Sequence, residues 1–183
     1  WGRHRNYLFV AVDTDEGVSG VGESGLTGRE LAVIGALDHL RPLVIGQDPM
    51  RTEHLWQTLS RGGFFPHDRV IGSALAAIDI ALWDIKGKAQ GLPVYDLLGG
   101  RTRDKVVCYC HLQGGQRVDT EPLVEEARQR VTEGWRFLRW SLPNEGELLH
   151  PSHAIEQAVR QFEALREAVG PEVGLCFDGH TRL

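Results

Sequence analysis

The chain has 183 residues, of which 25% are charged, and a formal net charge of −5 at pH 7. This length suffices for one large or two small domains with a hydrophobic core, and the acidic balance offers no basic patch suited to a nucleic-acid backbone. The apolar runs are far shorter than a membrane span, and no signal-peptide pattern opens the chain. Its three cysteines, an odd number, make a poor disulfide framework, so a reducing cytoplasm is the expected setting.

The first elements are a predicted β-hairpin. Residues 7–12 are an apolar run rich in strand formers, an Asp-rich turn follows at 13–17, and residues 18–23 form the second arm. The run Gly20-Val21-Gly22-Glu23-Ser24-Gly25 satisfies the GxGxxG pattern of dinucleotide sites, which requires a buried parallel strand before it and a helix directly after it. Here the helix signal comes later, as a Thr27-x-x-Glu30 capping box, so nucleotide binding is the weaker alternative.

Two helices and an aromatic loop are predicted next. The pattern indicates a helix over 28–40 and another over 48–59, the second capped at Asp48-Pro49 and with Trp56 in the core. Two glycines at 62–63 end this second helix, and the adjacent aromatic residues Phe64 and Phe65 fall in the loop that follows. Exposed aromatic residues in a loop suggest a lid or an interface, and packing against the following helix is the alternative.

The stretch 73–100 contains the strongest helical pattern of the chain. Its large apolar residues recur at helical spacing with alanines between them, which predicts a buried helix that another element approaches closely. Gly91 and Pro93 end this pattern. After Asp104 the predicted elements alternate as parallel βα units, with strands at 106–111, 136–142 and 173–177 and helices at 121–133 and 152–170.

Reactive groups in parallel α/β folds lie at the carboxyl ends of the strands. Asp178 and His180 follow the third predicted strand two residues apart, so in an extended backbone they point to the same side. A carboxylate there suits Mg²⁺, although an Asp at a strand end is also a common turn former. Near the first strand, Cys108 and Cys110 share one face and His111 the other; this splits a possible zinc set and favours burial of both thiols.

Several segments together resemble the enolase superfamily, in its mandelate racemase branch. They are AAIDIALWDIKGKAQGLPVYDLLGG, TDEGVSGVGE and the terminal FDGHTRL. The resemblance implies an α+β capping domain at residues 1–104, lacking its first strand, followed at 105–183 by the first βα units of a (β/α) TIM-type barrel. The chain is therefore expected to be an N-terminal fragment, itself inactive, of an enzyme that forms homo-oligomers at full length.

The resemblance also implies roles for individual residues. Asp178 occupies the place of the first of three acidic Mg²⁺ ligands, and Asp178-x-His180 resembles the segment in which sugar-acid dehydratases carry a general acid. Arg139 stands where racemases carry Lys-x-Lys, and because Arg stays protonated it is expected to bind substrate rather than to act as a base. The base is then expected to be a His beyond this chain. The substrate-binding positions implied are Glu23, Leu26, Phe64, Phe65, His67 and Arg182.

The function expected is that of a Mg²⁺-dependent acid-sugar dehydratase, a hydro-lyase that converts an aldonic or aldaric acid to a 2-keto-3-deoxy acid. A racemase or epimerase of the same superfamily is the first alternative, and Arg139 and Ser141 argue against it. A non-catalytic or nucleotide-binding module is the alternative from another class. The expected partner is a small carboxylate sugar, with neither nucleic acid nor membrane.

Overall fold

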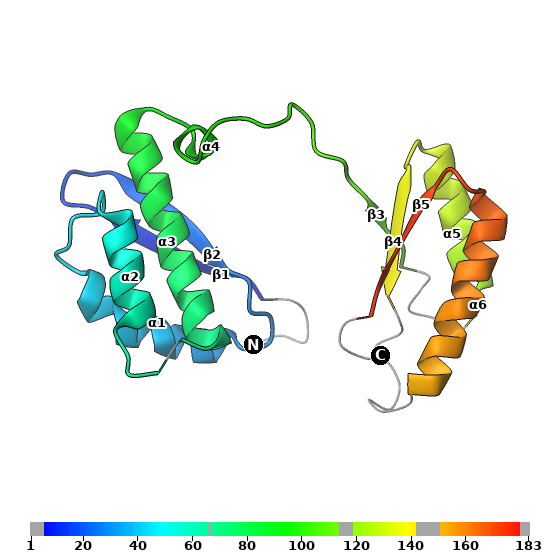
Figure 1. The fold of residues 1–183 in the computed structure, drawn as a ribbon, viewed down its shortest axis with the longest axis horizontal. Helices are drawn as coiled ribbons and strands as arrows, with labels where there is room; N and C mark the ends of the chain where they lie inside the picture. The colour runs from blue at the N-terminus through cyan, green and yellow to red at the C-terminus, as the bar shows by residue number, and fades with distance from the viewer. Residues whose placement is uncertain (1–5, 66, 114–118, 142–150, 180–183) are drawn as a thin grey trace. The chain divides into compact units, whose positions relative to one another are not determined.

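A computed structural model describes residues 6–65, 67–113, 119–141 and 151–179 of the chain. The chain divides into two compact units, Trp1–Thr102 and Arg103–Leu183, each with its own hydrophobic cluster. Figure 1 shows their elements, an α+β unit followed by alternating strands and helices. Within the described residues, no helix combines the length and the apolar character that crossing a membrane requires.

The first unit begins with the expected β-hairpin. Strand β1 (Leu8–Asp13) pairs antiparallel with β2 (Ser19–Ser24), with Leu8 opposite Ser24 and Asp13 opposite Ser19. The turn between them closes through Thr14, whose backbone N–H donates to the Val18 carbonyl at 3.0 Å. The antiparallel pairing differs from the buried parallel strand that a dinucleotide fingerprint requires.

Four helices complete this unit, and α3 is the one that packs along the hairpin. They are α1 (Glu30–Val44), α2 (Thr52–Arg61), α3 (Arg69–Gln90) and the short α4 (Val94–Leu97). In Figure 1 the long helix α3 runs along the hairpin. Its apolar side chains form the centre of a cluster with those of α1 and α2. Trp56 of α2 packs against that cluster, as the sequence predicted.

The alanines of α3 do permit a close approach, and β2 is the element that approaches. A Cβ atom added at Gly22 would lie 2.8 Å from the carbonyl carbon of Ala77, and one added at Gly20 would lie 3.0 Å from that of Ala81. Real Cβ atoms almost never come so near, so both positions require glycine. Two glycines of the GxGxxG pattern are thereby explained by strand–helix packing.

The ends of the helices correct two capping predictions. Helix α1 starts at Glu30 without a side-chain cap, and the Glu30 carboxylate instead accepts from the Gly28 N–H at 2.7 Å. The Thr27 capping box is therefore wrong. Asp48 accepts from the Met50 N–H in the turn before α2 and is not its N-cap residue. Helix α3 begins at Arg69, four residues before the predicted stretch at 73–100, and the carboxylate of its N-cap residue Asp68 accepts two backbone N–H groups of the first turn.

The outer edge of β2 is covered by two side chains from α3. The Asp84 carboxylate accepts from the Val21 N–H at 3.0 Å, and the Lys88 ammonium donates to the Ser19 carbonyl at 2.8 Å. Lys88 also pairs with Asp84 at 2.8 Å. The hydrogen bond from Lys88 and, to a smaller extent, the one from the Val21 backbone lower the pKa of Asp84. An open strand edge can pair with a strand of another chain, and these contacts protect the hairpin from such pairing.

The second unit contains three parallel strands with two crossover helices. The order in the sheet is β3-β4-β5, and the elements in chain order are β3 (Cys110–His111), α5 (Glu121–Thr132), β4 (Phe137–Ser141), α6 (Pro151–Val169) and β5 (Gly174–Asp178). The βα alternation is as predicted, and it is the start of a (β/α) barrel. The first strand is shorter than the expected 106–111, because residues 106–109 do not pair with β4.

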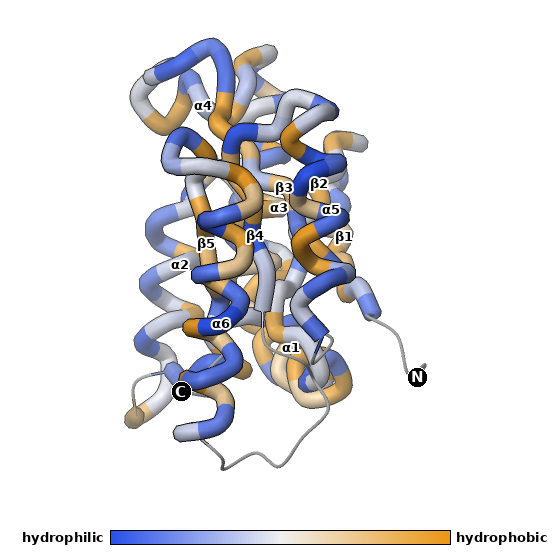
Figure 2. The backbone as a smooth tube through the Cα atoms, turned by 90° about the vertical axis from the view of Figure 1, so that its right-hand side faces the viewer, coloured by the Kyte–Doolittle hydropathy of each residue, from blue (hydrophilic) through white to orange (hydrophobic). Residues whose placement is uncertain are grey.

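Side chains from one face of these strands pack against α5 and α6. Trp140 of β4 is fully buried, donates from its indole N–H to the Gln161 side chain of α6 at 2.9 Å, and makes edge contacts with the rings of Phe162 and Phe177. Figure 2 shows hydrophilic and hydrophobic residues alternating along both helices, as expected for helices with one face on a sheet. The neighbours of Trp140 in β4, Arg139 and Ser141, lie on the opposite face of the sheet.

Candidate functional site

The carboxyl ends of β4 and β5 bring together the two charged residues that the sequence singled out there. In the parallel register Arg139 is opposite Cys176, and Asp178 is opposite Ser141. Because side chains alternate along a strand, Arg139 and Asp178 lie on the face opposite the buried Trp140. The Arg139 guanidinium forms an ion pair with the Asp178 carboxylate, and the two side chains are 19% and 33% exposed.

Two residues of the first strand region join this pair, and the sequence analysis had given neither a role. His111 is the register partner of Arg139, and the Tyr109 ring lies with its centroid 5.6 Å from the Arg139 guanidinium carbon. The Gln113 side chain contacts Nδ1 of His111 at 3.2 Å. The alternation of residues 107–111 did place Tyr109 and His111 on one face, but only the register shows that this face is shared with Arg139.

The cysteines of this region do not form a site. Cys110 is buried in the cluster with α5 and α6, whereas Cys108 is exposed, so the expected burial of both thiols is wrong for Cys108. The reason is that residues 106–109 lie outside the paired strand. His180 and Arg182 lie outside the described residues. Among the residues that are described, no three His, Cys, Asp or Glu side chains gather as a metal site.

The chemistry of Asp178 nevertheless fits one ligand of a magnesium ion. Its carboxylate oxygens are hard ligands at the end of a parallel strand, and Mg²⁺ commonly takes only one or two protein carboxylates besides water and substrate oxygens. The side chain of Asp178 is partly exposed. A complete set of ligands would require further groups in addition to Asp178.

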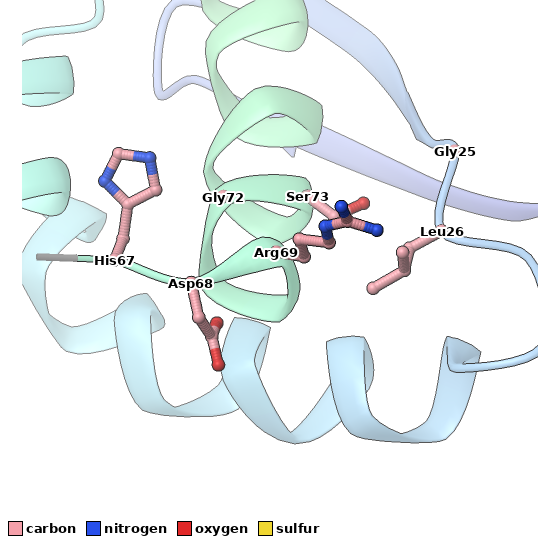
Figure 3. A pocket seen from close by; sticks show the side chains of 7 residues that line it. All are labelled: Gly25, Leu26, His67, Asp68, Arg69, Gly72 and Ser73. Carbon is pink, nitrogen blue, oxygen red and sulfur yellow. The ribbon is translucent and has the colours of Figure 1, made fainter. Parts of the chain in front are cut away.

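In the first unit, an open pocket of ≈ 570 Å³ lies between the end of β2 and the start of α3. Its lining comprises Gly25, Leu26, His67, Asp68, Arg69, Gly72 and Ser73, all labelled in Figure 3. Two of the predicted substrate-binding residues, Leu26 and His67, are thus in one pocket. Figure 3 shows Arg69 extending toward Leu26, while His67 and Asp68 point in other directions.

Short contacts hold both walls of this pocket. The Ser24 hydroxyl contacts the Ser73 hydroxyl at 2.8 Å, which fixes the end of β2 on α3. The imidazole of His67 contacts the Ser60 hydroxyl through Nδ1 at 3.1 Å. At the start of α1, the hydrogen bond from Gly28 lowers the pKa of Glu30 and ties its carboxylate to the loop that carries Leu26.

The other predicted substrate-binding residues do not line the pocket. Glu23 is exposed on the face of the hairpin that points away from α3. Phe64 and Phe65 are 95% and 78% exposed and stack edge to face at 5.0 Å, so the prediction of exposed aromatic residues in this loop is confirmed. Arg69, for which the sequence predicted no role, also lines the pocket.

Comparison with known proteins identifies the family. Residues 3–99 match the mandelate racemase / muconate lactonizing enzyme N-terminal domain. The chain belongs to this family. It is thereby a member of the enolase superfamily, with the capping domain followed by the beginning of the barrel.

Curated relatives are similar over nearly the whole chain. A "D-galactonate dehydratase" from Verminephrobacter eiseniae is 40% identical over 177 residues, which are 97% of this chain and 46% of the relative. A "D-mannonate dehydratase" from Rhizorhabdus wittichii is 36% identical, over 98% of this chain and 50% of the relative. The chain therefore spans about half the length of the curated relatives that it matches.

Solved structures give the same relationship. An enolase from Pantoea ananatis with bound D-gluconate and Mg is 32% identical with a TM-score of 0.84, and the match covers 97% of this chain and 50% of that one. A member of the enolase superfamily from Salmonella Typhimurium is 30% identical with a TM-score of 0.86, over 96% of this chain and 51% of that one. These similarities establish the family and the fold.

Proposed function

We propose that this chain is part of a Mg²⁺-dependent acid-sugar dehydratase, a hydro-lyase that removes water from an aldonic or aldaric acid. The observation that carries the proposal is the Arg139–Asp178 pair at the carboxyl ends of adjacent parallel strands. The dehydratases among its relatives and the gluconate-bound neighbour support this substrate class. We place the boundary between the capping domain and the barrel after residue 104, near the division of the structure into units at 102.

Asp178 is the proposed metal ligand of this chain. Bound Mg²⁺ would supply Lewis-acid stabilisation of the negative charge that develops on the substrate carboxylate when the α-proton leaves. The Arg139 guanidinium, which pairs with the Asp178 carboxylate, is the proposed group that binds a substrate carboxylate or hydroxyl. Because a guanidinium stays protonated, Arg139 does not remove the α-proton.

His180 is the proposed general acid. It follows Asp178 by two residues, and an imidazole can donate a proton near neutral pH. Its proton passes to the β-hydroxyl, the C–O bond breaks with its electron pair, and water leaves. The electron pair of the α C–H bond forms the double bond of an enol, and the enol then tautomerises to a 2-keto-3-deoxy acid. A base, which we expect to be a His in the part of the enzyme that corresponds to the other half of its relatives, takes the α-proton.

The substrate contacts of the capping domain are also part of the proposal. Leu26 and His67 are supported by their place in one pocket, whereas Glu23 and the loop residues Phe64 and Phe65 rest on the family resemblance alone, as does Arg182 of the barrel. We further propose that the full polypeptide is a cytoplasmic homo-oligomer. The odd number of cysteines supports the cytoplasmic location, and the exposed rings of Phe64 and Phe65 support a subunit contact.

The test is turnover by the full polypeptide that carries this sequence. C5 and C6 aldonic and aldaric acids are supplied with Mg²⁺ and then with a chelator, and 2-keto acid is measured. We expect metal-dependent 2-keto acid from one configuration, loss of turnover in Asp178→Asn, and loss of dehydration in His180→Asn. Exchange of the α-proton with deuterated water in the absence of any 2-keto acid would contradict dehydration and favour the epimerase alternative.

A further inference from the structure

Tyr109 contacts Arg139 but has no role in the proposed reaction. Its ring lies 5.6 Å from the guanidinium carbon of Arg139, within the range of a cation–π interaction. Arg139 is thus contacted by an aromatic ring and, through an ion pair, by the Asp178 carboxylate. The three side chains come from the residue before β3, the middle of β4 and the end of β5.

The register of the strands explains why Tyr109 can reach Arg139. Cys110 is opposite Leu138 and His111 is opposite Arg139, so Tyr109 precedes the register partner of Arg139 by two residues. Tyr109 itself lies just outside the paired strand, and its long aromatic side chain spans the remaining distance to Arg139. The pairing of Cys110 and His111 with β4 thus brings the preceding residue near Arg139.

Burial indicates that Tyr109 does not serve the hydrophobic core. The core cluster of this unit lies on the other face of the strands, around Trp140, and Tyr109 is 54% exposed. A half-exposed aromatic residue contributes little to stability by burial. Its packing against Arg139 restricts a long side chain that would otherwise sample many rotamers.

We propose that Tyr109 is a positioning residue, which holds the Arg139 guanidinium toward Asp178. For its catalytic consequence this inference rests on the proposed function, because Arg139 is the residue that would bind the substrate. Because the face of the aromatic ring makes the interaction, we expect Phe at position 109 to preserve it and Leu to abolish it. The free energy of an exposed cation–π contact corresponds to a change of about two- to fivefold in the equilibrium between the positioned and the released guanidinium.

The direct test uses nuclear magnetic resonance on the 183-residue chain. We compare the side-chain Nε–Hε signal of Arg139 and its hydrogen-exchange rate in the parent, Tyr109→Phe and Tyr109→Leu proteins. Tyr109→Leu should remove the ring-current shift of Arg139 and raise the exchange rate by about two- to fivefold, whereas Tyr109→Phe should preserve both. An unchanged shift and rate in Tyr109→Leu would overturn the proposal.

The chain provides a matched control. Tyr95 and Arg101 form a second tyrosine–arginine contact, at 5.2 Å, with a hydrogen bond between the Arg101 guanidinium and the Tyr95 hydroxyl at 3.0 Å. Tyr95→Leu should change the signal of Arg101 and leave that of Arg139 unchanged. A response of Arg139 to both substitutions would indicate a general loss of structure and would contradict a specific role for Tyr109.

A double-mutant cycle in the full polypeptide separates this inference from the proposed function. If Tyr109 acts through Arg139, Tyr109→Leu lowers kcat for dehydration about two- to fivefold, and it has no further effect in an Arg139→Gln background. Equal effects in both backgrounds would refute the positioning role while leaving dehydration established. If the full polypeptide dehydrates no acid, the proposed function fails, and the exchange measurement still decides whether Tyr109 positions Arg139.

Discussion

Gly22→Ala is the substitution to which the capping domain should be most sensitive. Gly22 faces α3, and an added Cβ would lie 2.8 Å from the carbonyl carbon of Ala77 and nearer still to its oxygen. Ordinary contacts of a Cβ atom begin at 3.4 Å. Both groups belong to the backbone, so no side chain can turn aside, and β2 would have to withdraw from α3 by roughly 1 Å in a close-packed interior.

The magnitude follows from this displacement. Overpacking costs about 1–3 kcal/mol when side chains can adjust, and separating the strand from the helix also forfeits dispersion contacts along their interface. We expect Gly22→Ala to lower the free energy of unfolding of this unit by about 3 kcal/mol or more. For a domain of about 100 residues, this lowers Tm by roughly 12–24 °C.

The assay is thermal and denaturant unfolding of the chain, with Gly25→Ala as the control. Gly25 belongs to the same GxGxxG run, but an added Cβ would meet nothing within 4 Å, and its backbone is not in the left-handed region. Its substitution should change stability by less than about 0.5 kcal/mol. If Gly22→Ala proved neutral and Gly25→Ala destabilising, strand–helix packing would not be the reason for these glycines.

Three further predictions concern stability. Gly35 is exposed in the interior of α1 with open space at its Cβ, so Gly35→Ala should raise the free energy of unfolding by about 0.5–1 kcal/mol, measured by urea denaturation; a loss would contradict this. The Lys88 hydrogen bond lowers the pKa of Asp84 below its ordinary 3.8, so its stabilising contribution is complete above that pH and is lost as the pH falls further. The stability of Asp84→Asn, followed by thermal unfolding between pH 6 and pH 2, should therefore depend less on pH than that of the parent, and parallel curves would refute this. Gln161→Leu leaves the buried indole N–H of Trp140 without this acceptor and should destabilise the second unit by about 1–3 kcal/mol, seen as faster amide hydrogen exchange in β4; unchanged exchange would contradict it.

The sequence predicted a structural feature correctly where that feature depends only on neighbouring residues. The apolar spacing after Ser73 predicted α3, and Gly91 predicted its end because a left-handed residue there, at φ 66°, suits glycine. The prediction of a helix end failed where one residue can make two different local hydrogen bonds. Thr27-x-x-Glu30 reads as a capping box, but the Glu30 carboxylate bonds to Gly28 and the helix begins at Glu30 itself.

The sequence by itself determined the family, the α+β and βα organisation, and the positions of the charged residues at strand ends, because periodicity and short motifs are properties of neighbouring residues. Only the tertiary structure decided which of them meet. Arg139 and Asp178 are 39 residues apart and meet because β4 and β5 align in one parallel register, and Tyr109, which directly precedes β3, reaches Arg139. A shift of that register by one residue would turn the side chains of a strand to the opposite face. The register depends on packing of the opposite face against α5 and α6, which no single segment specifies.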